Sequence, residues 1–249
     1  MAAYSVRAIV LRKTKLGETD VILSVLAEDG RQIRAVAKGM RKPGSRTSGR
    51  LEPFSEVDLL VHSGRSLDVI SEVEVLVAHA RLREDLDRSA AASVVADVLD
   101  KISLEGQIEE RLFSLAQVTL ASLESGSLET LCALVTAFLV KAMAMQGYRP
   151  QLEACAACSE HVSGGKFFSL ASGGVLCAEC GDADSSALRL SEAGRVLLVR
   201  LLRSTMADIA EMPPPEADVR EAFELMRSFV AYHLHARLKA LDFYAGLLT

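Results

Sequence analysis

The sequence contains no tryptophan, and aromatic residues make up only 5% of its 249 positions. The first 80 residues hold just two aromatic side chains, Tyr4 and Phe54. Ring stacking on a ligand can therefore contribute little in this region, and recognition there must depend mainly on charge.

Long apolar runs are also absent. No uninterrupted run reaches the ~18 residues that a membrane span needs. The first residues, MAAYSVRAIVLRK, lack an apolar segment followed by a cleavage site. Half of the residues are hydrophobic and 24% are charged, which is typical of a globular chain. We expect a cytoplasmic protein without a membrane partner, in which cysteines stay reduced.

The arrangements that enzymes use are missing as well. None of the five histidines stands beside a convincing nucleophile. The glycines at positions 39 and 44 are not followed by Gly-Lys-Ser/Thr, so they do not form a P-loop. The sequence therefore predicts a binding protein with no catalytic residues.

Positive charge is concentrated near the N-terminus. Residues 1–50 carry a net charge of +7, whereas the remainder carries −12. Residues 38–50 contain five cations, no acid, and interleaved Gly, Pro and Ser that disfavour a helix or a regular strand. Such crowding is best explained by a polyanionic ligand, although a solvated surface loop is the alternative. The cations able to meet phosphates are Arg7, Arg12, Arg34, Lys38, Arg41, Lys42, Arg46 and Arg50.

The N-terminal third reads as β-structure. Short apolar stretches separated by Gly-marked turns predict strands at residues 4–12, 21–26, 33–38, 57–62 and 67–77. Five strands with no intervening helix indicate an antiparallel barrel over residues 1–79. An OB-fold has this size, and an SH3-like barrel is the rival.

Helical periodicity follows, over a predicted α-helical domain at residues 80–249. The clearest helix covers residues 128–146, is apolar on nearly every side, and has Ser127 as its expected N-cap. Such a helix belongs at the centre of a bundle. Ser191 is the expected N-cap of another helix that runs to residue 202. The predicted fold class is thus α+β.

Four cysteines form the strongest chemical motif. Two CxxC pairs separated by eighteen residues have the spacing of a structural zinc site, with ligands Cys155, Cys158, Cys177 and Cys180. Residues 166–170 and 174–176 can form a hairpin that joins the pairs, within an insertion at residues 150–183. Four thiolates leave no open position, so one bound Zn²⁺ would be structural. A redox motif is the alternative, but its usual βαβ setting is not visible.

Two signatures resemble those of the RecO family of recombination mediators. KGMRK at residues 38–42 is followed by LEPF at residues 51–54, and GYRP at residues 147–150 precedes the cysteines. The order of barrel, helices and inserted zinc ribbon is also similar. The resemblance implies a nucleoid-associated DNA-repair protein that binds single- and double-stranded DNA and anneals complementary strands. It also implies cooperation with RecR and with the acidic tail of single-stranded-DNA-binding protein in loading RecA.

Two other classes of function remain open from the residues alone: a thiol oxidoreductase, and an RNA-binding or regulatory OB protein. We expect protein partners to bind the acidic, apolar helical domain. A pocket for the acidic tail of single-stranded-DNA-binding protein would need positive charge. The cations available in this domain are Arg195, Arg200, Arg203, Arg227, Arg237 and Lys239.

Overall fold

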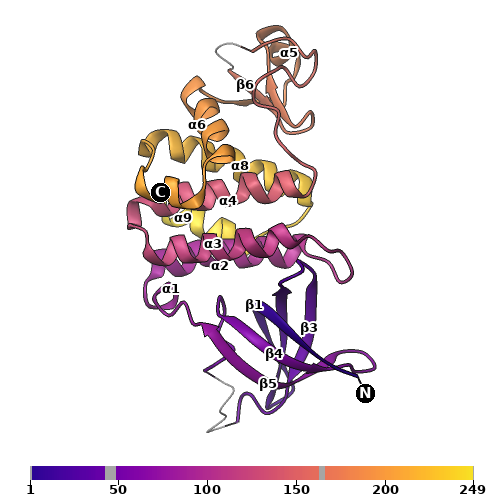
Figure 1. Cartoon of the computed structure of the whole chain (residues 1–249). Helices are drawn as coiled ribbons and strands as arrows, with labels where there is room; N and C mark the ends of the chain where they lie inside the picture. The colour runs from indigo at the N-terminus through magenta and orange to yellow at the C-terminus, as the bar shows by residue number, and fades with distance from the viewer. Residues whose placement is uncertain (1, 43–48, 163–165, 249) are drawn as a thin grey trace. The chain divides into compact units, whose positions relative to one another are not determined.

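The computed structural model describes residues 2–42, 49–162 and 166–248. The chain divides into two compact units, Met1–Glu124 and Ser125–Thr249 (Figure 1). The first contains a β-barrel and three helices, and the second contains further helices and the four cysteines. The predicted α+β class, with a barrel ahead of a helical region, is confirmed.

A closed barrel forms the N-terminal part of the first unit. The strand order is β1-β2-β3-β5-β4, and β1 pairs with β4 to close it. Every neighbouring pair is antiparallel except β3 and β5. This is the predicted five-strand, OB-like barrel, and each predicted strand agrees with an observed one to within a few residues. The strands are β1 (Ala3–Leu16), β2 (Asp20–Ala27), β3 (Gln32–Ala37), β4 (Glu56–His62) and β5 (Asp68–Val77).

The barrel interior follows from period-2 alternation, interrupted once. Val6, Ala8 and Val10 of β1 point into the buried core. The pairing of β1 with β2 then shifts between Val10 and Arg12, so one extra residue lies in β1. Without that bulge, Arg12 would share the face of Val10. With it, Arg12 pairs with Ser24 and is exposed.

Three helices complete the first unit: α1 (Arg81–Glu84), α2 (Leu86–Ile102) and α3 (Glu110–Ser125). The side chain of Asp85 accepts a hydrogen bond from the Arg88 amide and caps the start of α2. Ser24 of β2 donates to the Asp100 carboxylate of α2 at 2.6 Å, which ties this helix to the barrel.

The turn between β2 and β3 lies close to the segment before α3. The Glu109 amide donates to the Asp29 carbonyl at 3.0 Å. Gly30 has φ +86°, and a Cβ there would lie 2.1 Å from the Glu109 carbonyl oxygen. Only glycine fits this contact, because it both avoids the overlap and accepts the positive φ.

The second unit is built around α4 (Leu131–Met145). Eleven of its fifteen residues are buried, and it packs against α6, α7 and α8, which confirms the predicted central helix. The window Leu128–Met145 has the length and composition to cross a membrane, with only two charged residues, Glu129 and Lys141, interrupting it. It is 67% buried within the protein, as in the core helix of a globular domain. The helices packed on it are α6 (Glu192–Arg203), α7 (Met206–Glu211) and α8 (Glu216–Leu234), and α9 (Lys239–Leu247) contacts α8 through Tyr244 and Phe223.

The two predicted caps have different outcomes. Ser191 accepts from the Gly194 amide and caps α6, as predicted. Ser127 instead precedes a 3-10 turn, η1 (Leu128–Thr130), and its side chain makes no capping hydrogen bond. The α-helix begins only at Leu131, so that part of the prediction is wrong.

A small sheet carries the cysteines. The strands β6 (Phe167–Ser169) and β7 (Gly174–Leu176) form the predicted hairpin, and β8 (Leu188–Arg189) pairs with the other side of β6. A short helix, α5 (Ala178–Ala183), begins directly after Cys177. A Cβ at Gly181 would lie 2.2 Å from the Phe167 ring, so this helix packs closely on β6.

Candidate nucleic-acid interface and metal centre

One end of the barrel combines the start of the basic segment with the β1–β2 turn. The Arg41 amide donates to the Thr19 carbonyl at 2.8 Å, and its guanidinium reaches the Gly17 carbonyl at 3.4 Å. The Asp20 carboxylate accepts from the Gly39 amide at 2.8 Å. That amide, together with the Thr19 hydroxyl, lowers the pKa of Asp20. Residues 38–42 are therefore held in a defined position.

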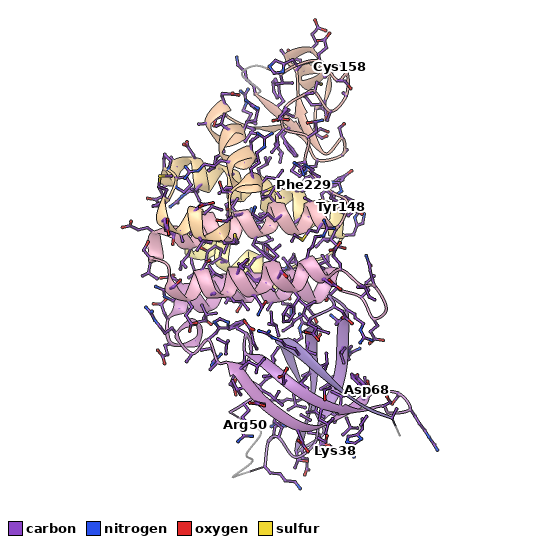
Figure 2. All side chains as sticks on the ribbon, in the orientation of Figure 1. Lys38, Arg50, Asp68, Tyr148, Cys158 and Phe229 are labelled. Carbon is purple, nitrogen blue, oxygen red and sulfur yellow. The ribbon has the colours of Figure 1, made fainter. Side chains whose placement is uncertain are left out.

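The cations at this end are available to a ligand. Lys38 and Lys42 are exposed here, and Arg34 is exposed further along β3, opposite Ser24. Within the described residues no ion pair involves any of these three. Arg41 and Arg50 are also exposed and bond to carbonyl oxygens of Gly17 and Val73. Figure 2 labels Lys38 and Arg50 toward the same end of the barrel. Arg46 lies outside the described residues.

Arg7 and Arg12 are bound to carboxylates in this structure. Arg7 contacts Glu56 at 2.9 Å, and its guanidinium lies 5.8 Å from the centre of the Phe113 ring. Arg12 contacts two carboxylates of α2. The assignment of these two arginines to the DNA interface stays a prediction.

Lys15 is a cation that the sequence analysis missed. It is exposed on β1, one residue before the end of the strand, and pairs with Val21. It therefore belongs to the hairpin whose turn holds residues 38–42. The signal was the run RKTK at residues 12–15, which continues the basic character of the strand into the turn.

A buried charged cluster around His79 was also missed. The His79 side chain is 3% exposed, and its Nδ1 lies 2.7 Å from Glu124 Oε2. Its Nε2 lies 3.5 Å from Glu56, a buried carboxylate that also accepts from Arg7 and from Gln117 of α3. This cluster joins β1, β4 and α3, so it fixes the helix to the barrel. Its contacts join residues up to 61 positions apart in the sequence, so no local pattern indicates it.

The four cysteine sulfurs converge on one point. All four Sγ atoms lie within 4.8 Å of one another, and those of Cys158 and Cys177 are 3.7 Å apart. A tetrahedral zinc with Zn–S bonds of ~2.3 Å requires sulfur separations of about 3.8 Å. The geometry thus fits a four-thiolate metal ion, and the predicted ligands lie together.

Local backbone and thiol chemistry support this fit. Burial opposes ionisation of Cys155, but the backbone amides of Cys177, Cys158 and Ala157 outweigh it and lower the pKa of that thiol to about 6. Hydrogen bonds with the Cys177 and Cys158 thiols raise the pKa of Cys180 to about 12. A cation among the sulfurs would favour the thiolate form of these ligands.

The second signature links the helices to this sheet. The Tyr148 ring lies 4.6 Å from His233 of α8, and His233 in turn contacts Phe229. Figure 2 labels Tyr148 and Phe229. Directly after the signature, Gln151 exchanges backbone hydrogen bonds with Gly173 and Val175 of the hairpin. The signature therefore positions the cysteine-bearing sheet on the end of α4.

The fold and the sites together define a class: an OB-like barrel with a cationic end, a helical region and a four-cysteine cluster. Comparison with known proteins names the family. Residues 1–79 match "Recombination protein O N terminal", and residues 83–242 match "Recombination protein O C terminal". The chain belongs to the RecO family, whose members are DNA repair proteins.

Three relatives named "DNA repair protein RecO" illustrate the match. The protein of Desulforamulus reducens is 32% identical over 98% of this chain and 94% of its own length. That of Nocardioides sp. is 35% identical over 96% and 98%. That of Rubrobacter xylanophilus is 41% identical over 72% of each.

Proposed function

We propose that this protein is a non-enzymatic recombination mediator that binds single- and double-stranded DNA and anneals complementary strands. One observation carries the proposal. Cations at one end of the barrel have no carboxylate partner within the described residues, whereas Arg7 and Arg12 have one. The set at this end comprises Lys38, Arg41, Lys42 and Arg50, with Arg46 as a predicted addition, and Arg34 lies further along β3.

The aromatic residues of the barrel are unavailable for stacking. Phe54 is 5% exposed, and the Tyr4 hydroxyl donates to Asp68 at 2.5 Å. A DNA strand held by phosphate contacts alone keeps its base edges free, which strand annealing requires.

Direct binding of fluorescently labelled single-stranded DNA tests this function. We expect mixed-sequence oligonucleotides of equal length to bind with similar affinity, and complementary strands to anneal faster with protein present. If the protein binds RNA much more tightly than DNA of the same length, the result would favour an RNA-binding OB protein instead. An absence of DNA binding at low salt would contradict the proposal.

The cysteine cluster supports a structural role for one Zn²⁺, held by Cys155, Cys158, Cys177 and Cys180. These four thiols supply the whole coordination sphere, so no ligand position remains for a substrate. Bound zinc without dithiol turnover would exclude a thiol oxidoreductase.

The family membership leads us to propose RecR, the tail of single-stranded-DNA-binding protein and, through them, RecA as partners in the cytoplasm at the nucleoid. We place the tail on the helical region. Several of its arginines already bond to carboxylates or carbonyls, whereas Lys239 is exposed with no ion pair within the described residues. Photo-crosslinking of a tail peptide to the full chain should label residues 80–249. Labelling confined to the barrel would contradict this placement.

A further inference from the structure

The Arg12 guanidinium is shared by two carboxylates of α2. A single nitrogen, Nη2, lies 2.7 Å from Asp97 Oδ1 and 3.2 Å from Asp100 Oδ2. The Arg12 side chain is 48% exposed, whereas those of Asp97 and Asp100 are only 15% and 13% exposed. A ligand in solution can therefore reach the arginine more easily than either acid.

Arg12 reaches these acids because of the bulge in β1. The register shift after Val10 turns Arg12 to the outer face of the barrel, beside Ser24. Asp97 and Asp100 are three residues apart and lie on one face of α2. The bulge and the helix together create a groove along β1, β2 and β3.

The groove contains arginines that can bind DNA phosphates, together with a carboxylate that opposes such binding. It encloses about 210 Å³ and is lined by Arg12, Arg34, Gln32, Ser24 and Asp100, among others. In OB-folds, oligonucleotides bind on the face of strands 2 and 3 and the adjoining loops. Arg34 is exposed in this groove, without an ion pair within the described residues.

We infer that Asp97 and Asp100 compete with DNA phosphates for Arg12, so that the groove is a latent DNA-binding track beside the cationic end. This inference rests on the proposed function. Because the Arg12 side chain is about half exposed, solvent weakens its two ion pairs, so a phosphate can replace them. The two carboxylates nevertheless repel the phosphates of an approaching DNA strand. While they are paired with Arg12, DNA is confined to the cationic end of the barrel.

Replacing the acids by their amides tests the competition. Asp97→Asn with Asp100→Asn keeps an acceptor oxygen for Ser24 and Gln32 but removes both charges. We expect labelled single-stranded DNA to bind about fivefold more tightly at low salt, or about 1 kcal/mol at 1.4 kcal/mol per tenfold change. The plot of log K against log salt should steepen by about 0.7 for the added phosphate contact. Asp97→Asn alone gives part of this gain and leaves the Asp100 contacts intact.

Asp87→Asn is the matched control, because it removes one exposed charge from the same helix. It should give neither a comparable gain nor a steeper slope. A gain as large as that of Asp97→Asn would mean that general charge, and not the Arg12 contact, is responsible.

Arg12→Ala distinguishes two explanations of tighter binding: release of Arg12 from the competing acids, and loosening of α2 when its ion pairs are lost. It breaks the same two ion pairs, yet it should not tighten binding, and it should abolish the gain when added to the amide variants. If Arg12→Ala alone tightens binding, the pairs only hold α2, and the inference is wrong. If the amide variants bind no more tightly while Arg41→Ala/Lys42→Ala weakens binding, the inference fails and the proposed function stands. If neither the wild type nor any variant binds DNA, the proposed function itself fails.

Discussion

The sulfur atoms of Cys158 and Cys177 lie 3.7 Å apart, although eighteen residues separate them in the chain. The β6–β7 hairpin makes this approach possible, because its short turn returns the chain to the first CxxC pair. Four thiolates at such distances repel one another, so a cation bound among them would stabilise the sheet.

Replacing Cys177 by Ser should therefore destabilise the cysteine-bearing sheet by several kcal/mol, since metal-binding energy is folding energy in such sites. Zinc per chain, measured by elemental analysis, should fall from one to near zero. Cys132→Ser is the control, because Cys132 lies outside the cluster and should leave zinc content unchanged. Freshly reduced wild-type protein without metal would contradict the zinc assignment.

DNA binding by the barrel should depend strongly on salt. If about five side chains neutralise phosphates, log K should fall with log salt at a slope near −3.5 on single strands, at about −0.7 per contact. Arg41→Ala with Lys42→Ala should flatten the slope by about 1.4 and weaken all sequences alike. Fluorescence anisotropy over a salt series measures both.

A matched pair of charges in the other unit provides the control for this experiment. Arg149 and Lys239 are exposed, and within the described residues no ion pair involves them. Arg149→Ala with Lys239→Ala should leave the slope nearly unchanged. Binding that barely responds to salt, or that varies strongly with base sequence, would show that phosphate contacts are not dominant.

Gly30→Ala should destabilise the first unit by about 2–4 kcal/mol, because the new Cβ overlaps the Glu109 backbone and the positive φ is strained. Gly106→Ala is the control. The φ of Gly106 is +112°, yet a Cβ there meets nothing within 4 Å. Gly106→Ala should therefore lower the free energy of unfolding clearly less than Gly30→Ala does. Denaturant unfolding of both variants provides the comparison. Equal losses would mean that φ strain alone, without the close contact, sets the requirement.

The capping box of α7 should make the stability of the protein depend on pH in the acidic range. The Thr205 hydroxyl and amide donate to Asp208 and lower the pKa of its carboxyl below 3.8. The stabilisation is therefore complete above pH 3.8 and is lost as the pH falls through the lower folded-state pKa. Thr205→Ala should unfold at a lower temperature than wild type near pH 6, and the difference should shrink below pH 3.8. A difference independent of pH would contradict this account.

Much of this architecture is visible in local sequence patterns. Alternation in β1 predicts its core residues, because it depends on neighbours two residues apart. The spacing of the two CxxC pairs predicts the cysteine cluster, because thiols in that pattern are typical of a structural metal site. The outward turn of Arg12 depends on a single-residue bulge and on acids 85 and 88 positions later, which no local pattern encodes. The His79 cluster and the packing of α2 on β1 and β2 likewise arise from contacts distant in sequence. The 3-10 turn after Ser127 shows that a residue suited to capping need not cap.

The topology of the barrel sets an order for its assembly during synthesis. The first half of β1 pairs with β4, from Ala3 with His62 to Ile9 with Glu56. A nascent chain that ends before β4 therefore leaves one edge of β1 without its partner. β3 likewise waits for β5, its parallel neighbour. Until both later strands emerge from the ribosome, the three-strand meander presents two open edges, each able to pair with another chain. Closure of the barrel leaves no open edge, so pairing with another chain is no longer possible there.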